Sequence, residues 1–374
     1  MPSWLKEGRG SLCGANVSLL LREMGITKPL LVAGERTKNV FFARTGMRLP
    51  VFDAFHPNPD LQDCVAGAAL YQEKVCDGLI SIGGGSAMDT AKGIKALLMT
   101  DIAHVRANQL PPEGKVPHLA IPGTAGTGAE TTAVAVLYED GQKLSVDHPA
   151  LLPDGVLLDG SLLDTLPEYH RKSCAMDALA QGIESWWAKK ATPGSRIHAE
   201  RAIRGVLDNL TAYLQGDRKA QDEMLHAAYE SGVAILTTRT TAAHAMSYQI
   251  TKKLGAAHGH ACMLTLPHLW AHLAAQAEYQ PMLTELAHIL GGEKPMDGAV
   301  LLKGLLAVLE LDKIPMPDDA TLDMLAASVN PERLGNHPEA LTTAQLRAIY
   351  VQAFTPMTDT ERAEAIAVWE QYGK

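Results

Sequence analysis

Three consecutive glycines, Gly83 to Gly85, constrain the fold of this chain more than any other feature of its sequence. They follow an apolar run at 78–82 that is typical of a buried strand, and Ser86-Ala-Met-Asp89 after them resembles a capping box at the start of a helix. A strand, a glycine turn and a helix N-terminus gather free backbone N–H groups and a positive dipole end at one place. This arrangement predicts a phosphate site. A tight structural turn is the alternative, because the G-x-G-x-x-G fingerprint is absent.

Strand-like and helix-like segments alternate through the rest of the first half. Apolar runs at 30–33, 50–55 and 119–122 predict further strands, and 17–24 and 61–74 predict helices. We expect loops after Gly34 and over 123–130 and a hairpin turn at 139–142. Asp89 and Lys92 share a helix face, and an exposed ion pair is the alternative to a functional role for them. The alternation predicts a doubly wound α/β domain with a mostly parallel sheet that binds a dinucleotide.

The second half of the chain has a different pattern. From about residue 162 the strand-like segments stop, and helical periods follow at 176–190, 196–214, 220–237 and 283–290. We therefore expect an α/β domain over residues 1–162 and an all-α domain over residues 163–374.

Residues 241–260 concentrate three histidines, a tyrosine and two lysines within the helical half. On one unbroken helix His244 and His258 would lie roughly 21 Å apart, so the chain must turn between them, and Gly255 and Gly259 are the expected breaks. Asp177 and Gln181 share a helix face at i and i+4. These side chains together predict a metal site with oxygen and imidazole ligands; ordinary hydrogen-bonded or solvated positions are the alternative for each alone.

Charge and cysteine content exclude several partner classes. The formal net charge is −9 and no basic run is present, which argues against nucleic acid and anionic membranes as partners. Five cysteines without a C-x-x-C pair suit a reducing cytoplasm better than a disulfide framework. Without a leader-like start or an apolar run of about 18 residues, we expect a cytoplasmic protein, and base rates favour a homodimer.

Five sequence blocks, taken together, resemble the iron-dependent alcohol dehydrogenase family. They are GGGSAMDTAK at 83–92, GTAGTGAE at 123–130, DGVLLD at 154–159, MDALAQGIE at 176–184, and His244-Ala-Met with His258-Gly259. The resemblance implies an N-terminal dinucleotide-binding domain and a helical C-terminal domain, with nicotinamide and a divalent ion, Fe²⁺ or Zn²⁺, meeting in the cleft between them.

The resemblance also assigns residues to the two bound groups. For the cofactor they are Gly34, Arg36, Gly83, Gly84, Gly85, Ser86, Asp89, Thr124, Thr127 and Lys143; for the metal they are Asp177, Gln181, His244 and His258. Gln181 stands where the family normally has a histidine and can bind only through a neutral carbonyl oxygen. Weaker binding, binding by three strong ligands, and an empty site are all open. We expect metal to bind, because the other ligands are retained.

The sequence also bears on the choice between NADPH and NADH. Gly34 stands where members of the family that use NAD often carry an aspartate, and Arg36 and Lys38 follow it closely. We therefore expect NADPH in preference to NADH, with Glu35 as the argument against.

Gln181, Trp186-Trp187 and Tyr248 resemble the phosphonoacetaldehyde reductase branch of the family, which forms 2-hydroxyethylphosphonate. We expect metal-assisted hydride transfer to the aldehyde, with Tyr248 or His260 supplying the proton. Arg239, Lys252 and Lys253 are the candidate anchors of the phosphonate. The alternatives are a reductase of another small aldehyde, a non-redox enzyme similar to dehydroquinate synthase, and a nucleotide-binding scaffold without catalysis.

Overall fold

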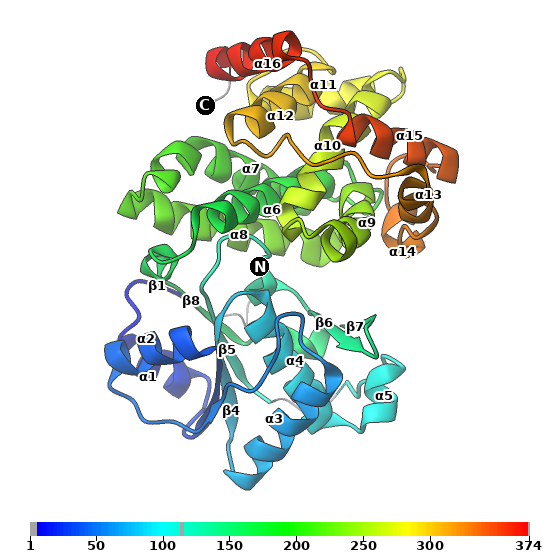
Figure 1. The fold of residues 1–374 in the computed structure, drawn as a ribbon. Helices are drawn as coiled ribbons and strands as arrows, with labels where there is room; N and C mark the ends of the chain where they lie inside the picture. Colours follow the sequence, from blue (N-terminus) through cyan, green and yellow to red (C-terminus); the bar gives the residue numbers. More distant parts are fainter. Residues whose placement is uncertain (1–5, 113–115, 373–374) are drawn as a thin grey trace. The chain divides into compact units, whose positions relative to one another are not determined.

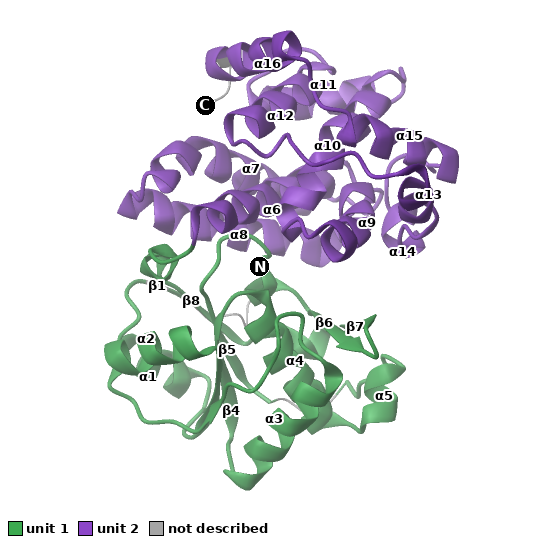
Figure 2. Ribbon diagram, in the orientation of Figure 1, with its two compact units in different colours: residues 1–166 green, residues 167–374 purple. Residues whose placement is uncertain are grey.

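The computed structural model describes residues 6–112 and 116–372 and divides the chain into two compact units. The first unit is Met1–Leu166 and the second is Pro167–Lys374 (Figures 1 and 2). No helix among the described residues is long and apolar enough to cross a lipid bilayer.

A six-stranded parallel sheet forms the centre of the first unit. In spatial order its strands are β1 (Lys6–Arg9), β8 (Gly155–Leu158), β5 (His118–Pro122), β4 (Gly78–Gly83), β2 (Pro29–Ala33) and β3 (Val51–Phe52). After β1 at one edge, the chain enters at β2, adds β3 on one side of it, and then adds β4, β5 and β8 on the other, which is the doubly wound arrangement expected from the sequence. The predicted strand at 50–55 is only two residues long, since β3 pairs along one edge alone.

Helices cover both faces of this sheet, because residues alternate between faces along each buried strand. On β2, Leu30 and Val32 join the core with α3 (Leu61–Glu73) and α4 (Gly85–Met99), whereas Leu31 and Ala33 join the core with α1 (Gly14–Glu23) and α2 (Glu35–Thr45). The loop expected after Gly34 is wrong: Gly34 is the N-cap of α2. A short α5 (Ile102–Arg106) and the predicted hairpin, β6 (Val134–Glu139) with β7 (Gln142–Asp147), complete the unit.

The second unit is all-α over its described residues, as its sequence periods predict (Figure 1). Its helices are α6 (Glu168–Trp187), α7 (Pro193–Leu214), α8 (Arg218–Thr238), α9 (Ala242–Gln249), α10 (His258–Ala274), α11 (Gln280–Leu290), α12 (Asp297–Val308), α13 (Asp319–Ala327), α14 (Pro331–Gly335), α15 (Thr343–Phe354) and α16 (Asp359–Tyr372). Helix α6 packs against α7, α8 and α10, and α10 also packs against α9. These contacts place α6, α9 and α10 side by side.

The chain reverses between α9 and α10, as the two-histidine argument requires. Helix α9 continues into a π-helical turn, η4 (Ile250–Leu254), which ends at Gly255 in the left-handed conformation with φ of 74°. Gly259 is not a break, contrary to expectation, because it is the second residue of α10. A Cβ on Gly259 would lie 2.0 Å from the Ser173 carbonyl oxygen and 2.7 Å from the Asp177 amide nitrogen. Its missing side chain therefore lets α10 pack directly on α6.

Candidate functional site

The glycine turn of the first unit lies between β4 and α4. Gly83 has a φ of 146°, Gly84 is the N-cap, and α4 begins at Gly85 without a side-chain cap. The expected capping box at Ser86 is therefore wrong; its hydroxyl instead accepts a hydrogen bond from the Asn58 amide at 3.3 Å. The first-turn N–H groups of α4 are not used by a capping side chain, which is what a phosphate site at a helix N-terminus requires.

The loop over 123–130 lies directly on this glycine turn. The Gly123 amide donates to the Gly83 carbonyl at 2.7 Å. A Cβ on Gly84 would lie 3.2 Å from Thr124 Cγ2, and one on Gly85 would lie 3.6 Å from Thr127 Cγ2. The structure thus brings together the glycines of the predicted phosphate site and the two threonines predicted to bind the cofactor, and the glycines leave the space between them open.

Lys92 is buried and does not form the exposed ion pair with Asp89 that its helical spacing suggests. Its ammonium donates to Ala129 O at 2.7 Å, Val134 O at 2.9 Å and Thr132 Oγ1 at 3.1 Å. It therefore ties the end of the threonine loop to α4. Burial raises the pKa of Asp89 to about 6, against the opposing charge of Lys92.

The remaining predicted cofactor residues lie at the surface of the same unit. The Arg36 guanidinium donates to the Thr165 carbonyl at 3.0 Å, and Lys38 forms an ion pair with Asp53. Lys143 is exposed on β7, opposite Tyr138 of β6. Both cations beside Gly34 therefore have protein partners in this structure.

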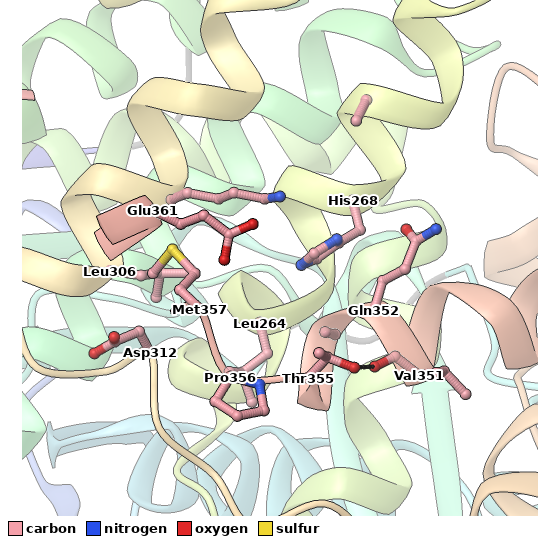
Figure 3. A pocket seen from close by; sticks show the side chains of 13 residues that line it. Leu264, His268, Leu306, Asp312, Val351, Gln352, Thr355, Pro356, Met357 and Glu361 are labelled. Carbon is pink, nitrogen blue, oxygen red and sulfur yellow. Dashed lines mark hydrogen bonds between the residues drawn. The ribbon is translucent and has the colours of Figure 1, made fainter. Parts of the chain in front are cut away.

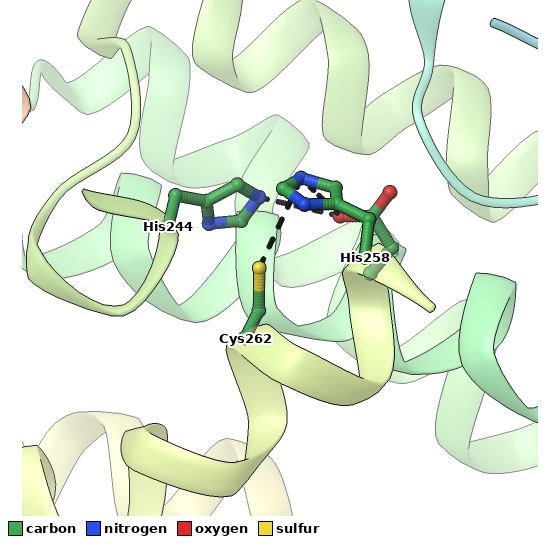
Figure 4. Close-up of side chains that lie close together, drawn as sticks. His244, His258 and Cys262 are labelled. Carbon is green, nitrogen blue, oxygen red and sulfur yellow. Dashed lines mark hydrogen bonds and ion pairs between the residues drawn. The ribbon is translucent and has the colours of Figure 1, made fainter. Parts of the chain in front are cut away.

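A cluster of four ligand-type side chains lies in the second unit: Asp177 on α6, His244 on α9, and His258 and Cys262 on α10. One potential ligand atom from each lies within 4.8 Å of every other. Asp177 Oδ1 is 3.2 Å from His244 Nε2 and 3.9 Å from His258 Nε2. Figure 4 shows both imidazoles and the thiol directed at a common point. We call this group the four-residue cluster.

Both imidazoles present Nε2 to this point, because hydrogen bonds hold Nδ1 from behind. His244 Nδ1–H donates to the Glu184 carboxylate. The single proton of the Ser247 hydroxyl goes to the His244 carbonyl at 2.8 Å, so its oxygen accepts from His258 Nδ1–H at 3.3 Å. Two Nε2 lone pairs and a carboxylate oxygen therefore face the same point, and all three are electron-pair donors. A cation at that point would bind all of them, so the residues suit a divalent metal.

Glu184 is the residue behind the cluster that sequence reasoning missed as a functional group. It is fully buried, and its Oε1 accepts from Thr241 Oγ1 at 2.6 Å and from the Ala243 amide at 2.7 Å. The Trp187 indole donates to Thr241 Oγ1 at 3.0 Å and so fixes that hydroxyl. A carboxylate that holds a ligating histidine in this way sets its tautomer and orientation.

The charges of the cluster reinforce one another. Burial would raise the pKa values of the Asp177 and Glu184 carboxyl groups, but the neighbouring imidazoles hold both below their ordinary range. Burial likewise opposes ionisation of the Cys262 thiol, yet the charges of His244 and His258 lower its pKa to about 7. The ionised forms of Asp177 and Cys262 that a metal requires are therefore within reach near neutral pH. The same negative charges raise the pKa values of His244 and His258 against the effect of burial, so a metal would displace a proton from each imidazole.

Gln181 lies beside the cluster, and Cys262 lies in it. The Gln181 amide nitrogen is 3.4 Å from Asp177 Oδ1, and its oxygen is 2.8 Å from Ser231 Oγ. The sequence predicted no role for Cys262. Its position four residues after His258, on the same face of one helix, is the signal that could have identified it.

The two candidate proton donors lie in different surroundings. The Tyr248 ring stacks on His258 at a centroid distance of 6.2 Å, next to the cluster. His260 donates from Nε2 to the Leu311 carbonyl at 2.8 Å, and its Nδ1 accepts from the Tyr169 hydroxyl at 3.1 Å. Both ring nitrogens of His260 are thus bonded to protein groups, whereas Tyr248 lies against a residue of the cluster.

The predicted phosphonate anchors occupy two segments. Lys252 and Lys253 are exposed on η4. Arg239 ends α8 with φ 62° and ψ 179°, a conformation that only glycine adopts readily. The Asn336 amide donates to Thr238 O at 2.8 Å and to Thr240 O at 3.1 Å, and so holds the strained residue from both sides.

A hollow of about 430 Å³ lies elsewhere in the second unit, among α10, α12, α15 and α16 (Figure 3). Its charged and polar lining includes His268, Lys303, Asp312, Gln352 and Glu361. None of the cluster residues lines it, so we separate this hollow from the candidate site.

Family models match most of the chain. The model described as iron-containing alcohol dehydrogenase matches residues 3–160, and the model of the C-terminal part of the Fe-containing alcohol dehydrogenase family matches residues 172–354.

Individual relatives carry related names. Probable alcohol dehydrogenase EutG of Salmonella typhimurium is 32% identical over 260 residues, 67% of this chain and 63% of that protein. Phosphonoacetaldehyde reductase of Streptomyces viridochromogenes is 36% identical over 230 residues, 57% of this chain and 58% of that protein. The matched regions thus span less than two thirds of either relative's length. The crystal structure of sulfoacetaldehyde reductase from Bifidobacterium kashiwanohense in complex with NAD⁺ superimposes with a TM-score of 0.85 at 26% identity, covering 95% of this chain and 97% of that one.

Proposed function

We propose, since this chain belongs to the iron-containing alcohol dehydrogenase family, that it reduces a small anionic aldehyde with a nicotinamide coenzyme, and that the aldehyde is phosphonoacetaldehyde. The product would be 2-hydroxyethylphosphonate. The observation that carries the proposal is the convergence of Asp177, His244 and His258, with both Nε2 atoms turned toward one carboxylate oxygen. Two relatives named as reductases of two-carbon aldehydes with an anionic head group support the substrate class.

The cluster residues would hold a divalent ion, which supplies a Lewis acid for the carbonyl oxygen, while the nicotinamide supplies the hydride. The protein's own part is to orient the ligands. Glu184 and Ser247 hold the two imidazoles so that Nε2 of each faces inward. Tyr248, which stacks on His258, would deliver a proton to the new alkoxide, directly or through water.

The substrate head needs cations to replace its water. We propose Arg239 as the principal anchor. Strained backbone conformations cluster at ligand-binding positions, and the two hydrogen bonds from Asn336 hold Arg239 in such a conformation. Lys252 and Lys253 would add positive charge from η4. For the coenzyme we propose NADPH ahead of NADH, because Gly34 places no carboxylate at the end of β2.

A second candidate substrate is sulfoacetaldehyde, favoured by the structural similarity to a sulfoacetaldehyde reductase over nearly the whole chain. Its sulfonate carries one negative charge, whereas a phosphonate carries up to two. The two candidates therefore differ in how strongly the rate should depend on the lysines of η4 and on pH near the second phosphonate ionisation.

The test is steady-state oxidation of NADPH and NADH with phosphonoacetaldehyde, sulfoacetaldehyde and acetaldehyde, on protein of known metal content. We expect kcat/KM to be highest for phosphonoacetaldehyde. Arg239→Ala should lower that value about 10- to 100-fold, the cost of one charge-assisted contact, while leaving acetaldehyde little changed. Equal rates with all three aldehydes would remove the anion anchor from the proposal. Bound coenzyme without net oxidation would favour a non-redox enzyme.

A further inference from the structure

We propose that Cys262 is a metal ligand and completes, with Asp177, His244 and His258, a site of one carboxylate, two imidazoles and one thiolate. This inference rests on the metal site of the proposed function but not on the substrate. It concerns the fourth coordination position of the metal, where Gln181 offers only a weak ligand.

Helix α10 places Cys262 correctly for this role. His258 begins the helix and Cys262 follows one turn later, so both side chains leave the same face. Cys262 Sγ is 3.9 Å from His258 Nε2, and within 4.8 Å of the ligand atoms of the other two residues (Figure 4). Zinc bonds of about 2.0–2.3 Å at tetrahedral angles separate the ligand atoms by about 3.3–3.7 Å. The cluster thus needs to contract by about 1 Å, which side-chain rotation can supply.

Gln181 is the rival for the same position. Its oxygen faces Ser231, whose one proton is also within reach of the Ala228 carbonyl at 2.7 Å. If the amide is reversed, its nitrogen donates to Ser231 and its carbonyl turns toward Asp177, where only a cation between the two oxygens makes the contact favourable. The two residues therefore make different predictions about the atoms around the ion: a sulfur for Cys262, and only nitrogen and oxygen for Gln181.

Charge balance favours the thiolate. Asp177 and Cys262 together carry two negative charges, which match a divalent ion in a buried site, whereas Gln181 adds none. A thiolate also selects for zinc over ferrous iron, because it is a soft ligand and zinc binds such sites more tightly. We therefore expect this chain to retain zinc in preference to iron when both are offered.

Spectroscopy of the full-length protein tests the proposal without any aldehyde. The Co²⁺-substituted protein should show a thiolate-to-cobalt charge-transfer band, and X-ray absorption of the zinc form should show one sulfur at about 2.3 Å. Cys262→Ser should abolish both signals. Cys174→Ser is the matched control, because Cys174 lies on α6 near Asp177 but outside the cluster, and it should preserve both. Metal bound with only nitrogen and oxygen neighbours in the unaltered protein would overturn the proposal.

A rescue experiment separates the two rival ligands. Cys262→Ser should weaken zinc binding at least about tenfold, and the added substitution Gln181→His should restore it without restoring the sulfur signals. Gln181→Ala alone should leave the sulfur signals in place. Loss of metal from Gln181→Ala but not from Cys262→Ser would assign the position to Gln181.

Alkylation of the unaltered protein gives a measurement that needs no variant. Bound zinc should protect Cys262 from iodoacetamide, as read by mass spectrometry, and leave the reaction of the partly exposed Cys13 unchanged. Because Cys262 is buried, the comparison uses the labelling of the metal-free protein as its reference: a Cys262 that reacts without zinc and reacts equally with it would refute ligation. Ligation without phosphonoacetaldehyde turnover would leave this inference standing and reject the substrate alone.

Discussion

The substitution Glu184→Gln isolates the part of the site that orients His244. The glutamine keeps the size of the side chain but must place its single carbonyl where Thr241 Oγ1 and the Ala243 amide both donate, at 2.6 and 2.7 Å. Its NH₂ group then faces His244 Nδ1–H, so two donors meet. The imidazole can relieve this only by moving its proton to Nε2, the atom that the metal needs.

We expect this change to weaken metal binding 10- to 100-fold, which corresponds to about 1.4–2.7 kcal/mol. The assay is a competition titration of zinc against a chromophoric chelator, with far-UV circular dichroism to show that the variant is folded. The matched control is Glu230→Gln. Glu230 is also a buried carboxylate that bonds a histidine, His198, but it lies outside the cluster. Unchanged zinc affinity in folded Glu184→Gln would refute the tautomer argument.

Three further predictions concern stability. Gly259→Ala should lower the free energy of unfolding by about 2 kcal/mol or more, because its Cβ would lie 2.0 Å from Ser173 O, while Gly335→Ala, with no atom within 4 Å, should be nearly neutral; equal denaturation midpoints would contradict this. Arg239→Gly should be more stable than Arg239→Ala by about 1 kcal/mol, since glycine alone accepts that backbone conformation, and the opposite order in urea unfolding would show that no strain is present. Burial raises the pKa of Glu130 from 4.5 to about 7, so its stabilising contribution is complete below pH 4.5 and is lost as the pH rises to 7, about 3 kcal/mol in all. Glu130→Gln should flatten that part of the pH profile of the unfolding free energy, and a profile identical to that of the unaltered protein would disprove the assignment.

Local patterns predicted much of the architecture because they arise from short-range geometry. Strand and helix periods depend on neighbours a few residues away, so the parallel sheet, the hairpin at β6 and β7 and the long helices of the second unit followed from them. The prediction failed where a helix had weak apolar periodicity, as in α2, and where a strand pairs along only one edge, as in β3.

Glycines show the limit of local reasoning most clearly. Gly255 ends a helix through its own positive φ, a property that a sequence pattern can signal. Gly259 has ordinary helical geometry, and its importance comes from the backbone of α6 against it. Lys92 shows the same limit. Its spacing from Asp89 suggested an exposed ion pair, but its side chain is buried against the loop over 123–130.

By itself, the sequence determined the two fold classes, the glycine turn after β4 and the chain reversal between His244 and His258, because the period of each segment and the required reversal are local properties. The resemblance to the family assigned Asp177 to the same metal as the two histidines. Only the tertiary structure decided what completes the cluster. It placed Cys262 among the ligand atoms, Gln181 against Ser231 and Glu184 behind His244. The physical reason is that helical spacing specifies which residues share a face, whereas the packing of α6, α9 and α10 specifies what that face meets.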